Sequence, residues 1–168
     1  SIVSERALRE IYLKGFEIAI KEGKARSVMT SYNPINGIWT EGNYDLCTTI
    51  LRKEWEFDGI VMTDWWAEAN TEGEKSTRGN KAPMVLAQND LYMCVSNSLE
   101  NPENDNVKER FEAGEVTRSD LQRNAKNILK FIMKSQAMLH ELNLISKEDL
   151  EEINAQDDDG NISLGDIV

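Results

Sequence analysis

The sequence predicts an α/β fold in which helices alternate with about three parallel strands. Segments with apolar residues at helical spacing alternate with short, continuous apolar runs. This alternation is typical of βα units built around a parallel sheet. The chain has 168 residues, 40% of them apolar, which is enough for one hydrophobic core. A complete (β/α)8 barrel needs about 250 residues, so a whole barrel is excluded.

The expected helices follow from apolar residues that recur every three or four positions. The first begins at Ser4 and carries Leu8 and Phe16 on its apolar face. Thr117 and Asp120 resemble a capping box, with Asp in place of the usual Glu or Gln. The expected helices span residues 4–22, 44–55, 83–88, a segment through 111, and 117–132.

The expected strands are shorter and lie between these helices. They span residues 27–32, 60–64 and 90–95, and the segments 33–37, 68–80 and 101–106 are expected to be loops. The second strand, Ile60 to Met62, stops at Asp64. Ligands of parallel α/β sheets collect at the carboxyl ends of the strands, and Asp64 falls at such an end.

Composition excludes several classes of partner. The net charge of −11 argues against nucleic acid and against an anionic membrane surface, because both need clustered Lys and Arg. A neutral ligand such as a sugar remains compatible. No apolar run reaches the roughly 20 residues of a membrane span, and no signal peptide is visible. Cys47 and Cys94 are expected to be buried free thiols, which favours a reducing, cytoplasmic location. A disulfide between them is the alternative.

The segment Asp64-Trp65-Trp66 combines a carboxylate on a rigid strand with two aromatic faces. Carbohydrate sites use this combination, since a carboxylate can attack an anomeric carbon while indole rings stack against sugar C–H surfaces. The residues alone also fit a structural alternative, in which Asp64 caps the next helix and both tryptophans belong to the core.

Several long motifs occur in one order along the chain and closely resemble glycoside hydrolase family 3, the β-glucosidase-like enzymes. They are SERALREIYLKGFEIAI, VMTSYNPINGIWTEGN, LRKEWEFDGIVMTDWW, LAQNDLYM and EVTRSDLQRNAKNILKFIMKSQAM. The resemblance implies a partial TIM-type (β/α) barrel, with residues 1–138 as the C-terminal portion of the barrel and 139–168 as an acidic, helical or poorly ordered tail. It also implies a retaining β-glycosidase that hydrolyses terminal non-reducing β-D-glucosyl residues without a metal or organic cofactor.

The resemblance also implies site residues. By their places in the motifs, Asp64 is the nucleophile, Tyr32 and Met29 belong to the glycone pocket, and Trp65 flanks the leaving group. For Trp66 we expect core packing. Asp90 resembles a barrel-strand aspartate of the family and is expected to be structural.

The chain also departs from the family pattern. A Lys-His pair that binds the glycone in the family is missing, and the one histidine, His140, lies beyond the matched motifs. The acid/base of the family usually comes from another domain, so no residue is assigned to it, and Glu68 does not inherit the role.

Two alternatives remain for the chain as it stands. The isolated 168 residues are expected to be inactive and to self-associate, or to pair with the remaining barrel and the sandwich domain of a parent protein, because a partial barrel leaves an open sheet edge. The tail, from Asp157 to Asp166, also resembles a calcium-dependent docking loop. Because Ala155 occupies the first ligand position, a poorly ordered acidic tail is the preferred interpretation.

Overall fold

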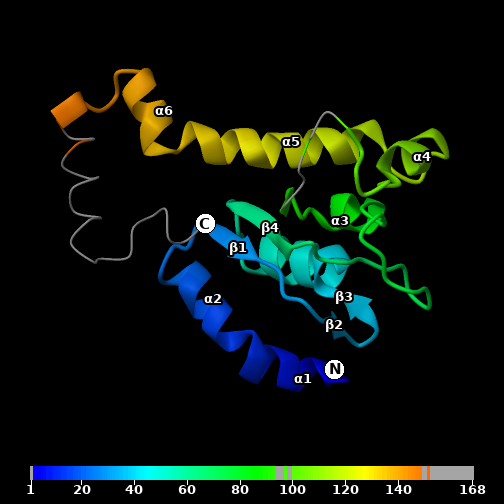
Figure 1. The fold of residues 1–168 in the computed structure, drawn as a ribbon. Helices are drawn as coiled ribbons and strands as arrows, with labels where there is room; N and C mark the ends of the chain where they lie inside the picture. The colour runs from blue at the N-terminus through cyan, green and yellow to red at the C-terminus, as the bar shows by residue number, and fades with distance from the viewer. Residues whose placement is uncertain (1, 94–96, 98–99, 149–150, 152–168) are drawn as a thin grey trace. The chain divides into compact units, whose positions relative to one another are not determined.

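The computed structural model describes residues 2–93, 97, 100–148 and 151 (Figure 1). The chain divides into two compact units, Ser1–Asn127 and Ile128–Val168. The first unit is a mixed α/β structure that contains every candidate site residue.

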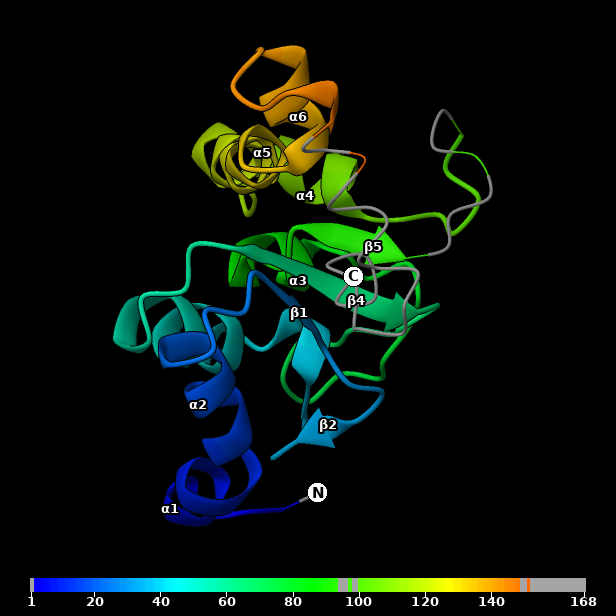
Figure 2. The same cartoon turned by 90° about the vertical axis from the view of Figure 1, so that its left-hand side faces the viewer.

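A parallel sheet of three strands lies at the centre of the first unit. The strands are β1 (Ser27–Met29), β4 (Ile60–Trp65) and β5 (Leu91–Met93), side by side in the order β1-β4-β5 (Figure 2). Met62 of β4 pairs with Met29 on one side and with Leu91 on the other. The predicted fold class, with about three parallel strands of a partial barrel, is therefore confirmed. β1 is shorter than expected, although the Thr30 N–H still donates to the Met62 carbonyl at 2.9 Å.

Helices connect the strands, and two of the expected helices contain π-type turns. The first consists of α1 (Glu5–Ala7), η1 (Leu8–Tyr12) and α2 (Lys14–Lys21), and it begins at Ser4, whose hydroxyl accepts a bond from the Ala7 N–H. The second is η3 (Asp45–Glu54). The others in this unit are α3 (Ala82–Ala87), α4 (Val107–Glu112) and the first part of α5 (Arg118–Met133).

A β-hairpin replaces the loop expected at residues 33–37. β2 (Pro34–Ile35) pairs antiparallel with β3 (Ile38–Trp39), and a 3-10 turn, η2 (Thr40–Gly42), follows. The two connecting residues, Asn36 and Gly37, have φ angles of 51° and 93°. Asn-Gly favours these left-handed conformations and is the strongest short signal for a two-residue hairpin. The loop prediction was wrong, because Asn36-Gly37 closes a hairpin in which the flanking residues pair.

The hydrophobic core packs helices against one face of the sheet. Val61 of β4, fully buried, lies in a cluster with Ile20 of α2, Leu51 of η3 and Phe57. Cys47 belongs to the same cluster as a free thiol, and burial raises its pKa to about 12. The expected buried free thiol is thus confirmed for Cys47, while Cys94 lies outside the described residues.

A buried ion pair ties η3 to the amino ends of β4 and β5. Arg52 of η3 donates to Asp90 Oδ2 at 2.5 Å, and the same oxygen accepts the Val61 N–H at 3.0 Å. Arg52 also bonds to the carbonyls of Gly59 and Gln88. Asp90 is therefore a structural residue, as expected, at the end of the sheet opposite Asp64.

Helix α5 begins at the predicted capping box. The Asp120 carboxylate accepts the Thr117 N–H at 2.9 Å, and the Thr117 hydroxyl accepts the Asp120 N–H at 3.3 Å. The buried residue of this helix is the polar Asn124, whose amide donates to the Val85 carbonyl in the last turn of α3. The apolar side chain of Leu121, in the first turn of this helix, is 37% exposed.

The second unit contains the end of α5 and α6 (Gln136–Glu141). Ser135 caps α6 by accepting the Met138 N–H. The proposed calcium loop lies outside the described residues. Within the described ranges, no three His, Cys, Asp or Glu side chains gather as metal ligands, and no helix combines the length and the hydropathy of a membrane span.

Candidate active site

Asp64 lies at the carboxyl end of the central strand, half-buried, where β4 leaves the sheet. Met62 lies opposite the helix-covered face of Val61, and the β4–β5 register shifts between Met62 and Trp65, directly where Asp64 lies. Asp64 Oδ1 accepts the Trp65 N–H at 2.7 Å. Among the described residues, the other carboxylate oxygen accepts no hydrogen bond. The strand thus holds a carboxylate with one unengaged oxygen at the rim of the sheet.

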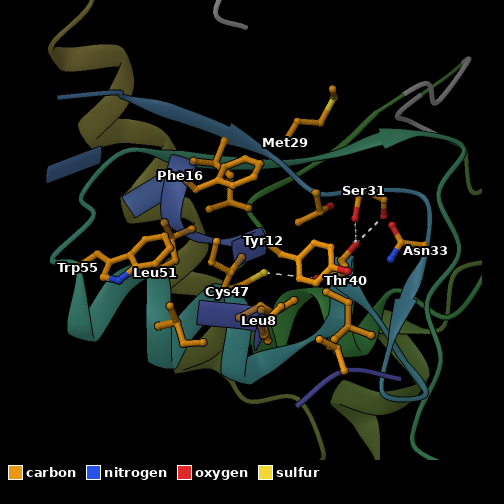
Figure 3. A pocket seen from close by; sticks show the side chains of 18 of the residues that line it. Leu8, Tyr12, Phe16, Met29, Ser31, Asn33, Thr40, Cys47, Leu51 and Trp55 are labelled. Carbon is orange, nitrogen blue, oxygen red and sulfur yellow. Dashed lines mark hydrogen bonds between the residues drawn. The ribbon is translucent and has the colours of Figure 1, made fainter. Parts of the chain in front are cut away.

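The end of β1 brings two further candidates to the same edge. Met29 pairs with Met62 in parallel register, so both side chains lie on the face opposite Val61. Met29 is 46% exposed, and Figure 3 shows it pointing away from the apolar cavity that lies on the helix side of the sheet. Tyr32 follows three residues later and is 49% exposed. The structure therefore places Met29, Tyr32 and Asp64 along the carboxyl edge of adjacent strands.

The two tryptophans after Asp64 are both exposed. Trp65, paired with Met93 of β5, is 41% exposed, and Trp66 is 47% exposed. The expectation that Trp66 packs in the core was wrong. A tight turn follows the strand, with the Ala67 N–H donating to the Asp64 carbonyl at 3.4 Å and Trp66 in the left-handed conformation at φ 53°. This turn directs Ala67 inward in place of Trp66, and Ala67 is 1% exposed.

A buried polar cluster next to this turn escaped sequence analysis. Glu41 is fully buried and burial raises its pKa to about 7, while burial lowers the pKa of Lys81 to about 8. The Lys81 ammonium lies 3.2 Å from the centre of the Tyr92 ring, and the Tyr92 hydroxyl donates to the Ala67 carbonyl at 3.3 Å. The cluster therefore connects to the turn that carries the tryptophans. No sequence signal marks Glu41, because an isolated Glu in a polar segment is normally solvated.

Glu68, the carboxylate nearest to Asp64 in sequence, has a partner within its own loop. Its Oε2 accepts a hydrogen bond from the Ser76 hydroxyl at 2.6 Å. This contact ties together the two sides of the loop between β4 and α3, where Ala69 and Thr77 also form an isolated antiparallel bridge. This hydrogen bond gives Glu68 a structural role in holding the loop together.

An apolar cavity of about 480 Å³ lies on the helix side of the sheet. Side chains from η1, α2 and η3 line it, among them Tyr12, Phe16, Leu51 and Trp55 (Figure 3). Of the candidate site residues, Met29 alone is among those lining it, and its side chain points away. The lining also includes Thr30, Ser31 and Asn33, which follow β1, but it does not include Asp64, Tyr32 or Trp65.

The carboxyl edge of the sheet carries some of the groups that a glycosidase site needs. One carboxylate can act as a nucleophile, and exposed aromatic rings can stack on sugar faces. Retaining glycosidases need a second carboxyl about 5–5.5 Å from the first, which serves as acid and then as base. The edge can supply the attacking group of such a reaction.

Comparisons with known proteins point to one family. Residues 2–131 match the family model of the glycosyl hydrolase family 3 N-terminal domain. A β-glucosidase from Ruminococcus albus is 54% identical over 142 residues, which cover 84% of this chain and 15% of that protein. The structure of a β-glucosidase from Paenibacillus barengoltzii superimposes with a TM-score of 0.75 at 56% identity, covering 81% of this chain and 15% of that one.

A more distant structure shows the same fold. β-Glucosidase 3B from Thermotoga neapolitana, solved in complex with glucose, has a TM-score of 0.68 at 38% identity, covering 83% of this chain and 19% of that one. This chain thus spans about 15 to 19% of the length of these relatives. The match over residues 2–131 shows that the chain belongs to glycosyl hydrolase family 3, as a part of its N-terminal barrel domain.

Proposed function

We propose that this chain supplies the nucleophile of a retaining β-glucosidase. The observation that carries the proposal is Asp64, held at the carboxyl end of β4 beside the exposed Trp65 in a chain of this family. Asp64 would attack the anomeric carbon of a terminal non-reducing β-D-glucosyl residue and form a covalent glycosyl-enzyme. A second carboxyl group, from outside the described residues, would protonate the leaving oxygen and then activate the water that releases glucose.

The neighbouring side chains would bind the two sides of the substrate. Tyr32 and Met29, on the β1 side of Asp64, would line the pocket for the glucosyl unit. Trp65, on the β5 side, would flank the leaving group. Met29 and Trp65 lie on strands, and sites built on such elements hold their geometry better than sites on loops.

The role of Asp64 as the nucleophile can be tested in a chimeric enzyme. Residues 2–131 would replace the matching segment of the Ruminococcus albus β-glucosidase, which supplies the rest of a complete enzyme. In this chimera, Asp64→Gly should lower turnover of an aryl β-glucoside by about a thousandfold or more. Azide should restore turnover and yield the α-glucosyl azide, because it attacks from the side that the carboxylate vacated.

The matched control is Glu68→Gln, which keeps an acceptor for the Ser76 hydroxyl. This variant should retain turnover and gain nothing from azide. Near-normal turnover of Asp64→Gly, or azide rescue of Glu68→Gln in its place, would refute the assignment.

For the isolated chain we propose a second behaviour, self-association without catalysis. β1 is an edge strand of the three-stranded sheet, and Ile11, Tyr12 and Phe16 on the first helix are 70%, 64% and 52% exposed. Unpaired strand edges and exposed apolar surfaces both favour association. A chromogenic β-glucoside should show no steady turnover by the isolated chain, and light scattering should show species larger than a monomer. A clean monomer that hydrolyses the glucoside would contradict both parts.

A further inference from the structure

The backbone conformation of Trp66 is unusual for a tryptophan. It is a bulky residue with φ 53°, in the left-handed region that glycine and asparagine favour. It occupies the third position of the turn Asp64–Ala67, where a positive φ is typical of glycine. A conformation this unfavourable for tryptophan persists only when the surrounding structure imposes it, and such positions cluster at functional sites.

The same turn exposes two consecutive indole rings. In a regular strand, neighbouring side chains point to opposite faces, so one of the two would be turned inward. The β4–β5 register shifts between Met62 and Trp65, and the chain then turns at Trp66. As a result Trp65 and Trp66 are 41% and 47% exposed directly after Asp64. Bulges that re-aim side chains in this way are common next to active sites.

We infer that Trp66 is a specificity-determining residue that stacks on the sugar of the leaving group, beyond the glucosyl unit attacked by Asp64. An indole offers a wide apolar face for the C–H surface of a pyranose and an N–H donor at its edge for a hydroxyl. The ligand class is a β-linked disaccharide or longer oligosaccharide. The inference rests on the proposed function, because it needs a glucosyl unit bound at Asp64.

Two contacts within the first unit support the turn. The Tyr92 hydroxyl bonds to the Ala67 carbonyl, and Lys81 lies over the Tyr92 ring. These contacts hold the backbone on the far side of Trp66. Trp66 is 47% exposed, so nearly half of its surface is open to a ligand.

The test compares two inhibitors of the chimera described above. Glucose occupies only the glucosyl subsite, whereas a sulfur-linked thiocellobiose, which is not hydrolysed, also fills the leaving-group subsite. Trp66→Ala should raise the inhibition constant of thiocellobiose about five- to tenfold and change that of glucose less than about twofold. Trp66→Phe should restore most of the affinity, because it keeps an aromatic face. Phe111→Ala removes another exposed aromatic ring, on α4, and should leave both constants unchanged.

A second measurement separates ligand binding from packing. In the 168-residue chain, Trp66→Gly should raise the midpoint of thermal unfolding, because glycine accepts φ 53° without strain. In the chimera the same variant should lose thiocellobiose affinity as Trp66→Ala does. A lower unfolding midpoint for Trp66→Gly, or an unchanged preference for thiocellobiose over glucose in Trp66→Ala, would overturn the inference. Absence of glucose inhibition in the unaltered chimera would instead refute the proposed function.

Discussion

Glu41 is a residue whose ionisation opposes folding. It is fully buried, neither carboxylate oxygen has a hydrogen-bond partner among the described residues, and desolvation raises its pKa from 4.5 to about 7. Lys81 attracts the carboxylate and Glu68 repels it. Between the unfolded and the folded pKa, the folded chain retains a proton that the unfolded chain has lost. Stability therefore falls as the pH rises through this range.

The corresponding prediction concerns the pH dependence of unfolding. The free energy of unfolding of the 168-residue chain should include a decrease of about 3 kcal/mol between pH 4.5 and 7 that Glu41→Gln abolishes. Urea titrations across this range measure it. The control is Glu17→Gln, because hydrogen bonds from Lys14 and Lys21 lower the pKa of that exposed carboxyl. An unchanged slope in Glu41→Gln would contradict the account of this residue.

At the scale of single residues, the sequence predicted the position of Asp64 but not the exposure of Trp66 or the burial of Glu41. Asp64 could be placed because a polar residue that ends an apolar strand must lie at the sheet edge. The exposure of Trp66 could not, because a positive φ at tryptophan has no sequence signal. The burial of Glu41 depends on contacts between distant segments, such as the Asn89 amide that bonds to the Glu41 carbonyl.

At the scale of elements, polar contacts as well as apolar packing hold helices to the sheet. Arg52 joins η3 to the amino end of β5 through Asp90, and Asn127 of α5 donates to the second oxygen of Asp90 at 2.9 Å. Arg123 and Asn124 of α5 bond to the carbonyl of Val85 in α3. The Val85 carbonyl also accepts the Gln88 N–H at 3.2 Å, and Arg123 bonds in addition to the Leu86 carbonyl, so these side chains tie α5 to the carbonyl end of α3.

The buried pair at Asp90 gives a prediction of stability. Asp90→Ala leaves the Arg52 guanidinium buried without its carboxylate, so the free energy of unfolding should fall by about 3–5 kcal/mol. Chemical denaturation of the 168-residue chain measures the loss. Glu112→Ala breaks the exposed pair with Lys108 on α4 and should cost less than about 1 kcal/mol. Equal losses in the two variants would show that burial of the pair is not what makes Asp90 important.

The order of the elements was readable from the sequence, but their detail was not. Alternation of helical and strand patterns predicted the β1-β4-β5 sheet and its helices. The β2–β3 hairpin had a signal in Asn36-Gly37, which the loop interpretation overlooked. The π-type turns of η1 and η3 carry no such signal, since apolar spacing does not distinguish them from α-helix.

At the scale of the whole molecule, the chain is a fraction of a larger architecture. It spans 15% of the Ruminococcus albus relative, and its parallel sheet has three strands in the described part. The exposed ring of Phe16 lines the apolar cavity beside η3. We expect this cavity and the β1 edge to take part in the proposed self-association.

A charge placed in the cavity should therefore weaken association. Phe16→Glu should shift the isolated chain toward monomer in sedimentation velocity, because a carboxylate is costly to bury in an apolar contact. Phe111→Glu, at a similarly exposed phenylalanine on α4, should leave the distribution unchanged. Equal shifts in both variants would point to a general effect of charge and against this surface.

The identity of the nucleophile can be read most directly by trapping the covalent intermediate. An activated 2-deoxy-2-fluoro-β-glucoside slows release of the glycosyl group, because fluorine destabilises the oxocarbenium-like transition state. Incubated with the chimera, digested and sequenced by mass spectrometry, it should leave a fluoroglucosyl group on Asp64. A label on any other carboxylate, with Asp64 unmodified, would contradict the account.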